Sequence, residues 1–320
     1  SNLGLGLDYV LMALAPNLWW LFVGRVISGM TAASVSTGMA YVADITPPEK
    51  RSMAFGKVGV AFGLGFVLGP ALGGLLGSVD PRLPFWVAAA LSLANAAYGY
   101  FILPESLPPE RRRPFQWRRA NPVGSLALLR RHPGLSGLAG VVFLSNLAHV
   151  ALPATFVLYA AYRYGWQERD VGLVMAGVGI CSALVQGALV GPTVRRFGER
   201  RALLVGLACG AVGFLGYGLA PTGLLFLAAV PVVALWGLAS PAAQGIMSRH
   251  IGPTEQGALQ GATGSLMGIA TMIGPGLFAG IFAYSIGAGT HWHAPGAAFV
   301  LASLLLAAGA LLAARTTART

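Results

Sequence analysis

The chain has 320 residues, of which 56% are hydrophobic and only 10% are charged. This balance excludes an ordinary soluble protein, in which about a quarter of the residues are charged. The net charge of +11 would suit a nucleic-acid-binding protein, but the cations gather in loops between uncharged stretches, so we expect no nucleic-acid partner.

The uncharged stretches predict an all-α membrane protein with ten spans, because a helix needs about 20 apolar residues to cross the hydrocarbon core of a bilayer. Glycine is abundant, with 45 residues, as is typical of helices that pack closely within a membrane. We expect the spans, in chain order, at residues 3–15, 18–44, 54–78, 84–103, 136–161, 170–191, 201–220, 223–248, 256–284 and 295–314.

The first span contains Asp8, which is the only acidic residue in the middle of any expected span. It lies about eight residues before the expected outer end at Pro16, which places it near the bilayer midplane. Burial in hydrocarbon favours the neutral form of a carboxylate, so Asp8 is a candidate for taking up and releasing a proton. The alternative is a static ion pair with Arg25, the only cation that lies away from the ends of a span.

The span at 54–78 carries a glycine stripe, because Gly65, Gly69 and Gly73 recur every four residues and therefore lie on one helix face. Gly74 follows the stripe directly. Pro70 removes one backbone hydrogen bond and bends the helix there. A bent, closely packed helix between two halves can seal one side of a membrane protein while the other side opens. An ordinary small-residue packing face is the alternative.

Part of this pattern returns in the 256–284 span, as is typical of transporters built from two related halves around a central site. At an offset of 205 residues, Gly56, Gly59, Gly69 and Pro70 fall on Gly261, Gly264, Gly274 and Pro275.

The segment 104–134 is rich in proline and arginine, which is typical of a linker. It separates a bundle of four expected spans, residues 1–103, from a bundle of six, residues 135–320. Because the repeated helix is third in one bundle and fifth in the other, we expect two further helices upstream of Ser1.

The cations predict the orientation, since 17 of the 21 lie in alternate loops and in the C-terminal tail. Positive loops stay on the cytoplasmic side, so we expect both chain ends in the cytoplasm and the protein in the inner (plasma) membrane. Cys181 and Cys209 fall within spans and are interpreted as packing residues. We expect no metal and no cofactor.

Several short motifs carry a resemblance to a known family. They are Gly24-Arg25, Ala43-Asp44-Ile45-Thr46, Gly65–Gly74, Pro104-Glu105-Ser106, Gly191–Arg201, Pro241–Gln244, Ser248-Arg249 and Ile273-Gly274-Pro275. On these motifs the chain resembles the drug:proton antiporters of the major facilitator superfamily, and most closely the tetracycline-efflux family. The resemblance implies helices three to twelve of a 6+6 arrangement and a monomer that exchanges an amphipathic drug, such as tetracycline, for protons by alternating access.

The resemblance also implies roles for four charged residues. Asp8 and Arg25 would couple transport to protons, whereas Asp44 and Arg51 would belong to a gate at the cytoplasmic mouth, with Gly274 and Pro275 repeating the bent helix. Arg25 as a structural partner and Asp44 as a solvated loop-end acid remain the alternatives. The chain departs from the family at Gly210, where an Asp is expected, so Asp8 is its sole membrane carboxylate.

A cavity for a large amphipathic drug needs aromatic walls and a few polar anchors. Within the spans, the wider set of candidates is Asn95, Asn146, His149, Gln186, Trp236, Gln244, Phe278 and Phe282. As substrate-binding residues we select Asn146, Gln186, Trp236, Gln244 and Phe278, with helix–helix packing as the alternative for each.

The motifs leave two other functions open, an uptake or metabolite carrier of the same superfamily and an inactive truncated remnant. The Gly65–Gly74 motif argues against uptake. An enzyme is not expected, because the sequence has no nucleophile–base pairing and no metal-spaced cluster and therefore no catalytic residues.

Overall fold

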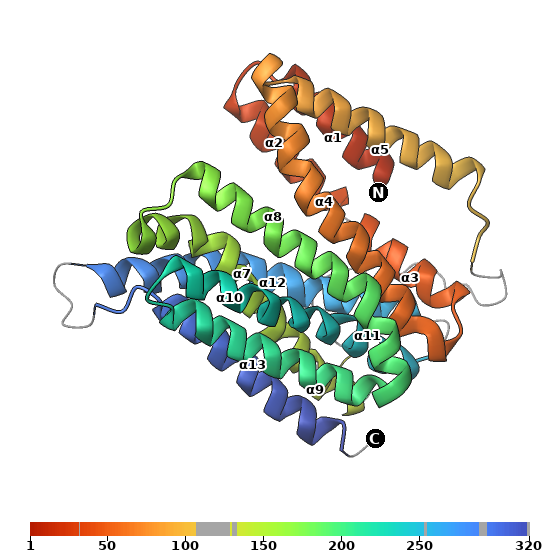
Figure 1. The fold of residues 1–320 in the computed structure, drawn as a ribbon. Helices are drawn as coiled ribbons and strands as arrows, with labels where there is room; N and C mark the ends of the chain where they lie inside the picture. Colours follow the sequence, from red (N-terminus) through yellow and green to blue (C-terminus); the bar gives the residue numbers. More distant parts are fainter. Residues whose placement is uncertain (32, 107–128, 130–132, 253–254, 288–292, 319–320) are drawn as a thin grey trace.

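The computed structural model describes residues 1–31, 33–106, 129, 133–252, 255–287 and 293–318, and these residues form a bundle of helices (Figure 1). The elements are α1 (Asn2–Leu14), α2 (Leu18–Thr31), α3 (Ser34–Ile45), η1 (Pro48–Lys50), α4 (Arg51–Val79), α5 (Leu83–Phe101), α7 (Pro133–Tyr164), α8 (Glu168–Leu184), η3 (Val185–Leu189), α9 (Val190–Leu219), α10 (Gly223–Ala234), η4 (Leu235–Leu238), α11 (Ala239–Arg249), α12 (Gln256–Ile286) and α13 (Ala297–Thr316).

Six helical segments of the described chain are long and apolar enough to cross a membrane. They are Leu18–Ile45, Gly134–Tyr164, Arg169–Leu219, Gly223–Arg249, Gln256–Ile286 and Ala297–Thr316. The longest, Arg169–Leu219, has 51 residues and reverses direction at Gly198, whose φ of 80° lies in the left-handed region that favours glycine. It therefore covers the predicted span 170–191 and all but the last residue of the predicted span 201–220.

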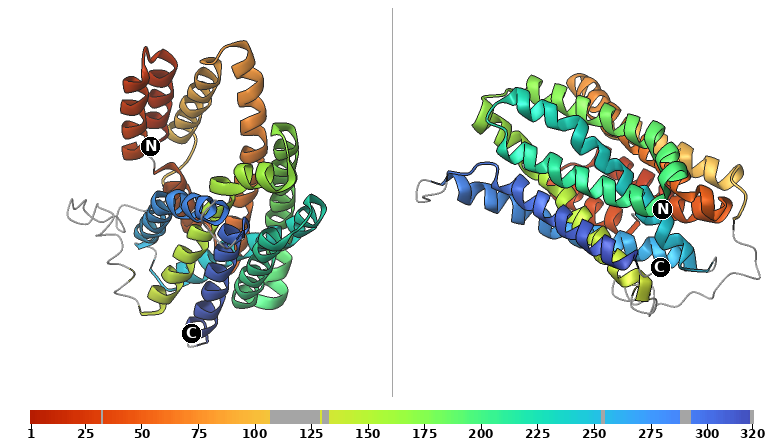
Figure 2. Two further views of the ribbon diagram at one scale, coloured as in Figure 1. Left: turned by 90° about the vertical axis from the view of Figure 1, so that its left-hand side faces the viewer. Right: turned by 60° about the horizontal axis from the view of Figure 1, so that its bottom comes forward.

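The helices form two groups in space (Figure 1). The first group is α1, α2 and α5 with the later part of α4, and the second group is α7 to α13. A view turned by 90° shows the first group standing to one side of the second (Figure 2). The early part of α4 reaches down from the first group to the second. Most of the expected linker at 104–134 lies outside the described residues.

Small residues let the first-group helices approach one another. A Cβ atom on Gly6 of α1 would lie 2.7 Å from the Leu93 side chain of α5, and one on Gly4 would lie 2.6 Å from Thr31 of α2. Glycine is thus required at both positions in this packing, as expected for helices that associate by close backbone approach in a membrane.

The second group is tied together by aromatic residues at the end away from the arginine-rich loop. The hydroxyl of Tyr159 on α7 donates a hydrogen bond of 2.9 Å to the carbonyl of Tyr217 on α9. Tyr164 donates a similar bond to the carbonyl of Ala220, also at 2.9 Å. The Tyr217 ring stacks on Phe226 of α10, with 4.1 Å between ring centroids. These contacts hold α7, α9 and α10 in a fixed arrangement.

Two breaks in regular helix geometry lie opposite one another in the second group. The π-helix η3 continues α8, and the 3₁₀-helix η4 follows α10, which contains Pro231. Proline removes a backbone donor, and departures from α geometry of this kind recur at functional positions. Gln186 lies in η3 and Trp236 in η4.

The fold confirms the prediction of an all-helical membrane protein, and the helix ends agree with the predicted spans to within a few residues. One difference is the expected span 18–44, which consists of α2 and α3. The backbone at Ala33 departs from helical geometry, with φ −101° and ψ 7°.

Candidate functional site

Asp8 forms an ion pair with Arg25 inside the first group. The distance from Arg25 Nη2 to Asp8 Oδ2 is 3.3 Å, and the Asp8 side chain has no exposed surface whereas that of Arg25 is 55% exposed. The second carboxylate oxygen, Oδ1, is buried and has no hydrogen-bond partner among the described residues. A Cβ atom on Gly24 would lie 2.7 Å from this oxygen, so the glycine provides the room that Asp8 occupies.

The two groups meet at Arg51, the first residue of α4. This buried side chain donates from Nε to the carbonyls of Ala43 at 3.1 Å and Thr46 at 3.2 Å. Its Nη1 donates to the carbonyl of Ser248 on α11 at 3.1 Å. Gln256 donates to the same carbonyl at 2.9 Å. Arg51 thus joins α3 and α4 to the second group.

A second link at this end involves Glu199, which is not among the residues predicted from the sequence. Its side chain is only 7% exposed, accepts a hydrogen bond from the Ser52 hydroxyl, and lies 3.2 Å from Nη2 of Arg249. The sequence signal that could have pointed to Glu199 is that it is the single acid within the arginine-rich motif Gly191–Arg201. An acid among cations at a helix turn is a candidate for a specific ion pair, because its neighbours would otherwise have no counter-charge.

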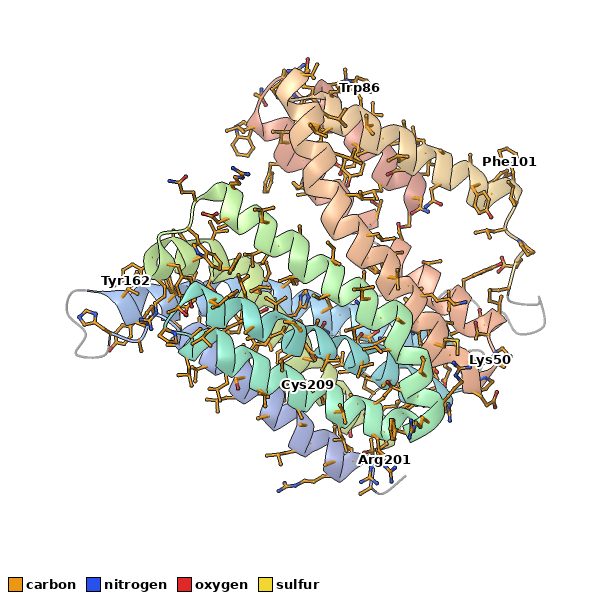
Figure 3. The ribbon with its side chains drawn as sticks, viewed as in Figure 1. Lys50, Trp86, Phe101, Tyr162, Arg201 and Cys209 are labelled. Atoms are coloured by element: carbon orange, nitrogen blue, oxygen red, sulfur yellow. The ribbon has the colours of Figure 1, made fainter. Side chains whose placement is uncertain are left out.

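Asp44 lies near the same end but does not take part in these links. Its Oδ2 accepts a hydrogen bond of 3.0 Å from the Ser106 hydroxyl, whereas the hydrogen bonds described for Arg51 go to backbone carbonyls. Lys50 and Arg201 lie at this end, and Trp86 and Tyr162 lie at the far ends of the two groups (Figure 3). The basic end of the protein is therefore the end where the groups touch.

Contacts between the groups continue along α4 for about three turns. A methyl group on Gly59 would overlap Oε1 of Gln186 in η3, and a Cβ atom on Gly63 would lie 3.2 Å from that of Ala183 on α8. Beyond this level the groups separate. A Cβ atom on Gly65, Gly69 or Gly73 would meet nothing within 4 Å.

The glycine stripe therefore differs from its expected packing in this conformation. Gly65, Gly69 and Gly73 border open space, and the close approach lies at Gly59 and Gly63 instead. These two glycines lie on a different face of α4 from the stripe, because Gly63 and Gly65 are only two residues apart. The stripe continues through α4, which also contains Pro70 and Gly74.

The repeated pair in α12 has a different environment. A Cβ atom on Gly274 would lie 2.7 Å from Val150 of α7, so Gly274 packs within the second group, while Pro275 lies inside the helix.

Four of the predicted substrate residues lie on the second group and are half-buried. Trp236 donates from Nε1 to the Ser145 hydroxyl at 3.1 Å. The Gln244 amide oxygen accepts a hydrogen bond of 3.2 Å from Gln260. Gln186 packs between Gly59 and Gly237, and Asn146 lies on α7. The structure brings Gln186 close to the Trp236–Gly237 turn.

Phe278, the fifth predicted substrate residue, lies in the packed interior of the second group. Its side chain is fully buried in the hydrophobic core of the second group, because α12 turns this face toward α7. Phe282 is buried as well. Neither ring lines an open surface. The face of α12 that carries Phe278 and its opposite face are both apolar, so the sequence alone could not show which of them lies in the core and which lines a cavity.

Two hollows in the second group lie away from the predicted residues. One of about 280 Å³ lies between α8 and α10 and is lined by Leu173, Val174, Gly177, Cys181, Leu227, Val230 and Pro231. A larger one of about 710 Å³ lies at the far end and is lined by residues that include Trp166, Gln167 and Arg169. In the described part of the chain, no three His, Cys, Asp or Glu side chains gather as a metal site would require.

Comparison with known proteins gives consistent matches. Residues 1–275 match the model of the Major Facilitator Superfamily. The chain is 36% identical to the tetracycline resistance protein, class C, of Escherichia coli, over 89% of this chain and 72% of the relative. It is 34% identical to the class G protein of Vibrio anguillarum, over 91% of this chain and 74% of that one.

Among solved structures, the human organic anion transporter MFSD10 (TETRAN) has a similar fold. The two structures superpose with a TM-score of 0.85 at 24% sequence identity, and the superposition covers 98% of this chain and 75% of the MFSD10 chain.

Proposed function

Because the chain belongs to the major facilitator superfamily and is homologous to tetracycline-efflux proteins, we propose that it exports tetracycline or a related amphipathic drug in exchange for protons. The chain is a multi-pass membrane transporter of small molecules, and transporters are not enzymes. In this proposal it is a monomer in the inner (plasma) membrane with both ends in the cytoplasm. Residues 1–103 and 135–320 act as two bundles joined by the linker at 104–134.

One observation carries the proposal, namely that the two helical groups touch at one end and separate toward the other. The Arg51–Ser248 hydrogen bond closes the basic end, whereas Gly65 and Gly69 on the same helix border open space. Since basic loops face the cytoplasm, the arrangement corresponds to a state open to the outside. Alternating access requires a second state in which the outer end closes.

The glycine stripe is suited to form that second contact. Gly65, Gly69 and Gly73 present a smooth face on α4, and a neighbouring helix can approach such a face closely. We propose that this face, with Pro70 and Gly74 and with Gly274 and Pro275 in the related helix, allows the outer end to close. Asp44 and Arg51 belong to the opposite, cytoplasmic gate.

The Asp8–Arg25 pair supports a role in proton coupling. Oδ2 of Asp8 faces Arg25, and Oδ1 is buried without a partner, which is unfavourable for a charged carboxylate. A proton bound at Oδ1 removes the negative charge and weakens the attraction to Arg25. Protonation of one buried atom would thereby change the contact between α1 and α2.

The drug would bind between the groups, at the half-buried polar and aromatic residues of the second group. Gln186 and Trp236 lie at the level where α4 leaves the second group, and Asn146 and Gln244 lie on neighbouring helices. Such a mixture of aromatic and amide groups suits an amphipathic molecule. Phe278 would become available only if α12 rotated.

The test is accumulation of tetracycline in inside-out membrane vesicles under an imposed pH gradient, compared for the unaltered chain, Asp8→Asn and Glu49→Gln. Glu49 is exposed and serves as the matched acidic control. We expect accumulation by the unaltered chain and by Glu49→Gln, and loss of gradient-driven accumulation in Asp8→Asn. Absence of accumulation by the unaltered chain would refute the proposed function. Normal, pH-dependent transport by Asp8→Asn would refute the role of Asp8.

A further inference from the structure

Among the Asp, Glu, His, Lys and Arg residues that the structure describes in the second helical group, one lies far from the membrane surfaces. His149 lies at the centre of the 31-residue segment Gly134–Tyr164, fifteen positions from each end. A span of this length places its centre near the bilayer midplane. An ionisable residue at such a depth is a candidate functional group, because hydrocarbon disfavours its charge.

His149 faces away from the packed side of α7. Ala148, Val150 and Ala151 are all buried, whereas the His149 side chain is exposed. Ser145 lies one helical turn earlier on the same face. The imidazole lies across from Trp236, with 5.6 Å between ring centroids, and Trp236 donates to the Ser145 hydroxyl. Among the described residues, no side chain or carbonyl forms a hydrogen bond with the His149 ring.

The exposed side of His149 borders the space between the two groups. Trp236 is followed by Gly237, where a Cβ atom would lie 3.2 Å from the Gln186 side chain. Gln186 in turn contacts Gly59 of α4. Among the contacts described between α4 and the second group, only that between Gly63 and Ala183 lies farther from the basic end. The His149–Trp236 pair therefore lies beside the point where the groups begin to separate, which leaves the imidazole accessible from the open side.

No charged neighbour holds the imidazole in one protonation state. The helices α11, α12 and α13 pack against α7, while η4 contacts it through Trp236 and α9 and α10 contact it through Tyr217 and Phe226. The charged residues of these elements lie at the Gly198 turn, at the last residue of α11 and near the end of α13, and they are Arg195, Arg196, Glu199, Arg200, Arg201, Arg249 and Arg315. The ionisable groups of α4, Arg51 and Lys57, lie at the basic end, below Gly59. Asp8 and Arg25 lie across the open space, in the first group.

We propose that His149 is the proton-binding group of the second helical group and that drug and proton exclude one another beside Trp236. This inference rests on the proposed function of proton-coupled export. It assigns a second protonation site, additional to Asp8.

The proton balance follows from the two states. In the outward-open state, one nitrogen of the neutral imidazole accepts a proton from water, and the imidazolium is stabilised by the Trp236 ring. In the inward-open state the proton passes to cytoplasmic water and the neutral imidazole is restored. A drug that stacks on Trp236 occupies the same space, so drug binding at this place displaces the proton.

The binding test compares tetracycline affinity as a function of pH for the purified chain, His149→Gln, His149→Asp and the control His250→Gln. His250 lies at the basic end, where its Nδ1 contacts the Ile246 carbonyl. We expect the dissociation constant of the unaltered chain to rise toward about tenfold per pH unit on the acid side of the imidazole titration. His149→Gln should flatten this dependence, and His149→Asp should restore it at lower pH.

A purely structural role would weaken binding in His149→Gln at every pH and leave the slope unchanged, and that result would overturn the inference. A readout independent of any drug is the NMR signal of labelled histidine, assigned to His149 by its loss in His149→Gln. We expect this signal to titrate between about pH 5 and 8. A His149 signal that stays in one form would refute the inference even if export is confirmed, and a titrating signal without drug transport would refute only the proposed function.

Discussion

The guanidinium of Arg51 donates a hydrogen bond of 3.1 Å to the carbonyl oxygen of Ser248, although the two residues are 197 positions apart in the chain. Ser248 lies in the last turn of α11, where carbonyl groups lack intrahelical donors and carry the negative end of the helix dipole. A buried cation at this point satisfies such a carbonyl. In this link the charge of Arg51 therefore meets backbone carbonyls, whereas the neighbouring link from Ser52 goes to the Glu199 carboxylate.

Replacing Arg51 should weaken the closed end. In Arg51→Gln, the carbonyls of Ala43 and Ser248 lose a charged donor, and such a bond contributes about 1.5–3 kcal/mol. We expect the closed state to lose population by roughly 10- to 100-fold. The measurement is the rate of thiol labelling from the cytoplasmic side at Met53→Cys, a residue that packs on Gly191.

The labelling experiment uses a chain in which Cys181 and Cys209 are replaced by serine, and Lys57→Gln is the matched control. Lys57 lies on the same helix but is exposed, so its loss should leave the labelling rate unchanged. Equal labelling rates in Arg51→Gln and the unaltered chain would contradict the assigned role of Arg51.

A methyl group added at Gly59 should lower the stability of the protein, whereas one added at Gly65 should not. At Gly59 the methyl overlaps the Gln186 amide, whereas at Gly65 it meets no atom within 4 Å. Overpacking typically costs about 1–3 kcal/mol, and alanine in a helix interior gains about 0.5–1 kcal/mol over glycine. Thermal unfolding in detergent should therefore occur at lower temperature for Gly59→Ala and at an unchanged or higher temperature for Gly65→Ala.

The same pair of variants tests whether the stripe acts in the second state. If α4 packs along Gly65 when the outer end closes, a larger residue in Gly65→Leu should reduce transport without lowering the unfolding temperature of the open state. Full transport by Gly65→Leu would show that the glycine stripe has no role in closing the outer end.

Gly24 offers a test of Asp8 that leaves the carboxylate in place. A methyl group in Gly24→Ala would lie 2.7 Å from Asp8 Oδ1, the oxygen proposed to bind a proton. Displacing this oxygen should cost about 1–3 kcal/mol, which corresponds to a loss of roughly 5- to 150-fold in gradient-driven transport. Gly29→Ala on the same helix meets no atom within 4 Å and should transport normally. Equal rates for the two variants would show that the space beside Oδ1 is not required.

The hydropathy of the chain was sufficient to predict the helices, because burial in lipid decides where long apolar stretches form spans. Asp8 and Arg25 could be singled out for the same reason, since each is the only charge of its sign that lies away from the ends of an expected span. Their pairing, one of the two interpretations, is present at 3.3 Å. Both findings depend on local composition alone.

Features that depend on tertiary contacts were not predictable in this way. The burial of Phe278 depends on which face of α12 meets α7, and periodicity does not distinguish a core from a cavity wall when both are apolar. Glu199 was missed because its partners Ser52 and Arg249 are distant in sequence. The open space beside Gly65 depends on how the two groups are arranged, which local composition does not determine.

The tyrosine hydroxyls that tie α7 to α9 have a mechanical consequence. In the proposed alternating-access cycle, the second group would swing as one stiff body, because Tyr159 and Tyr164 cross-link its end away from the basic loops, and it would pivot where α4 touches it. The 29 residues of α4 form a lever about 44 Å long. A tilt of about 10° at the pivot would move the distant tip by roughly 8 Å along an arc, so a slight loosening at Arg51 translates into an outer passage wide enough to admit or exclude a small molecule.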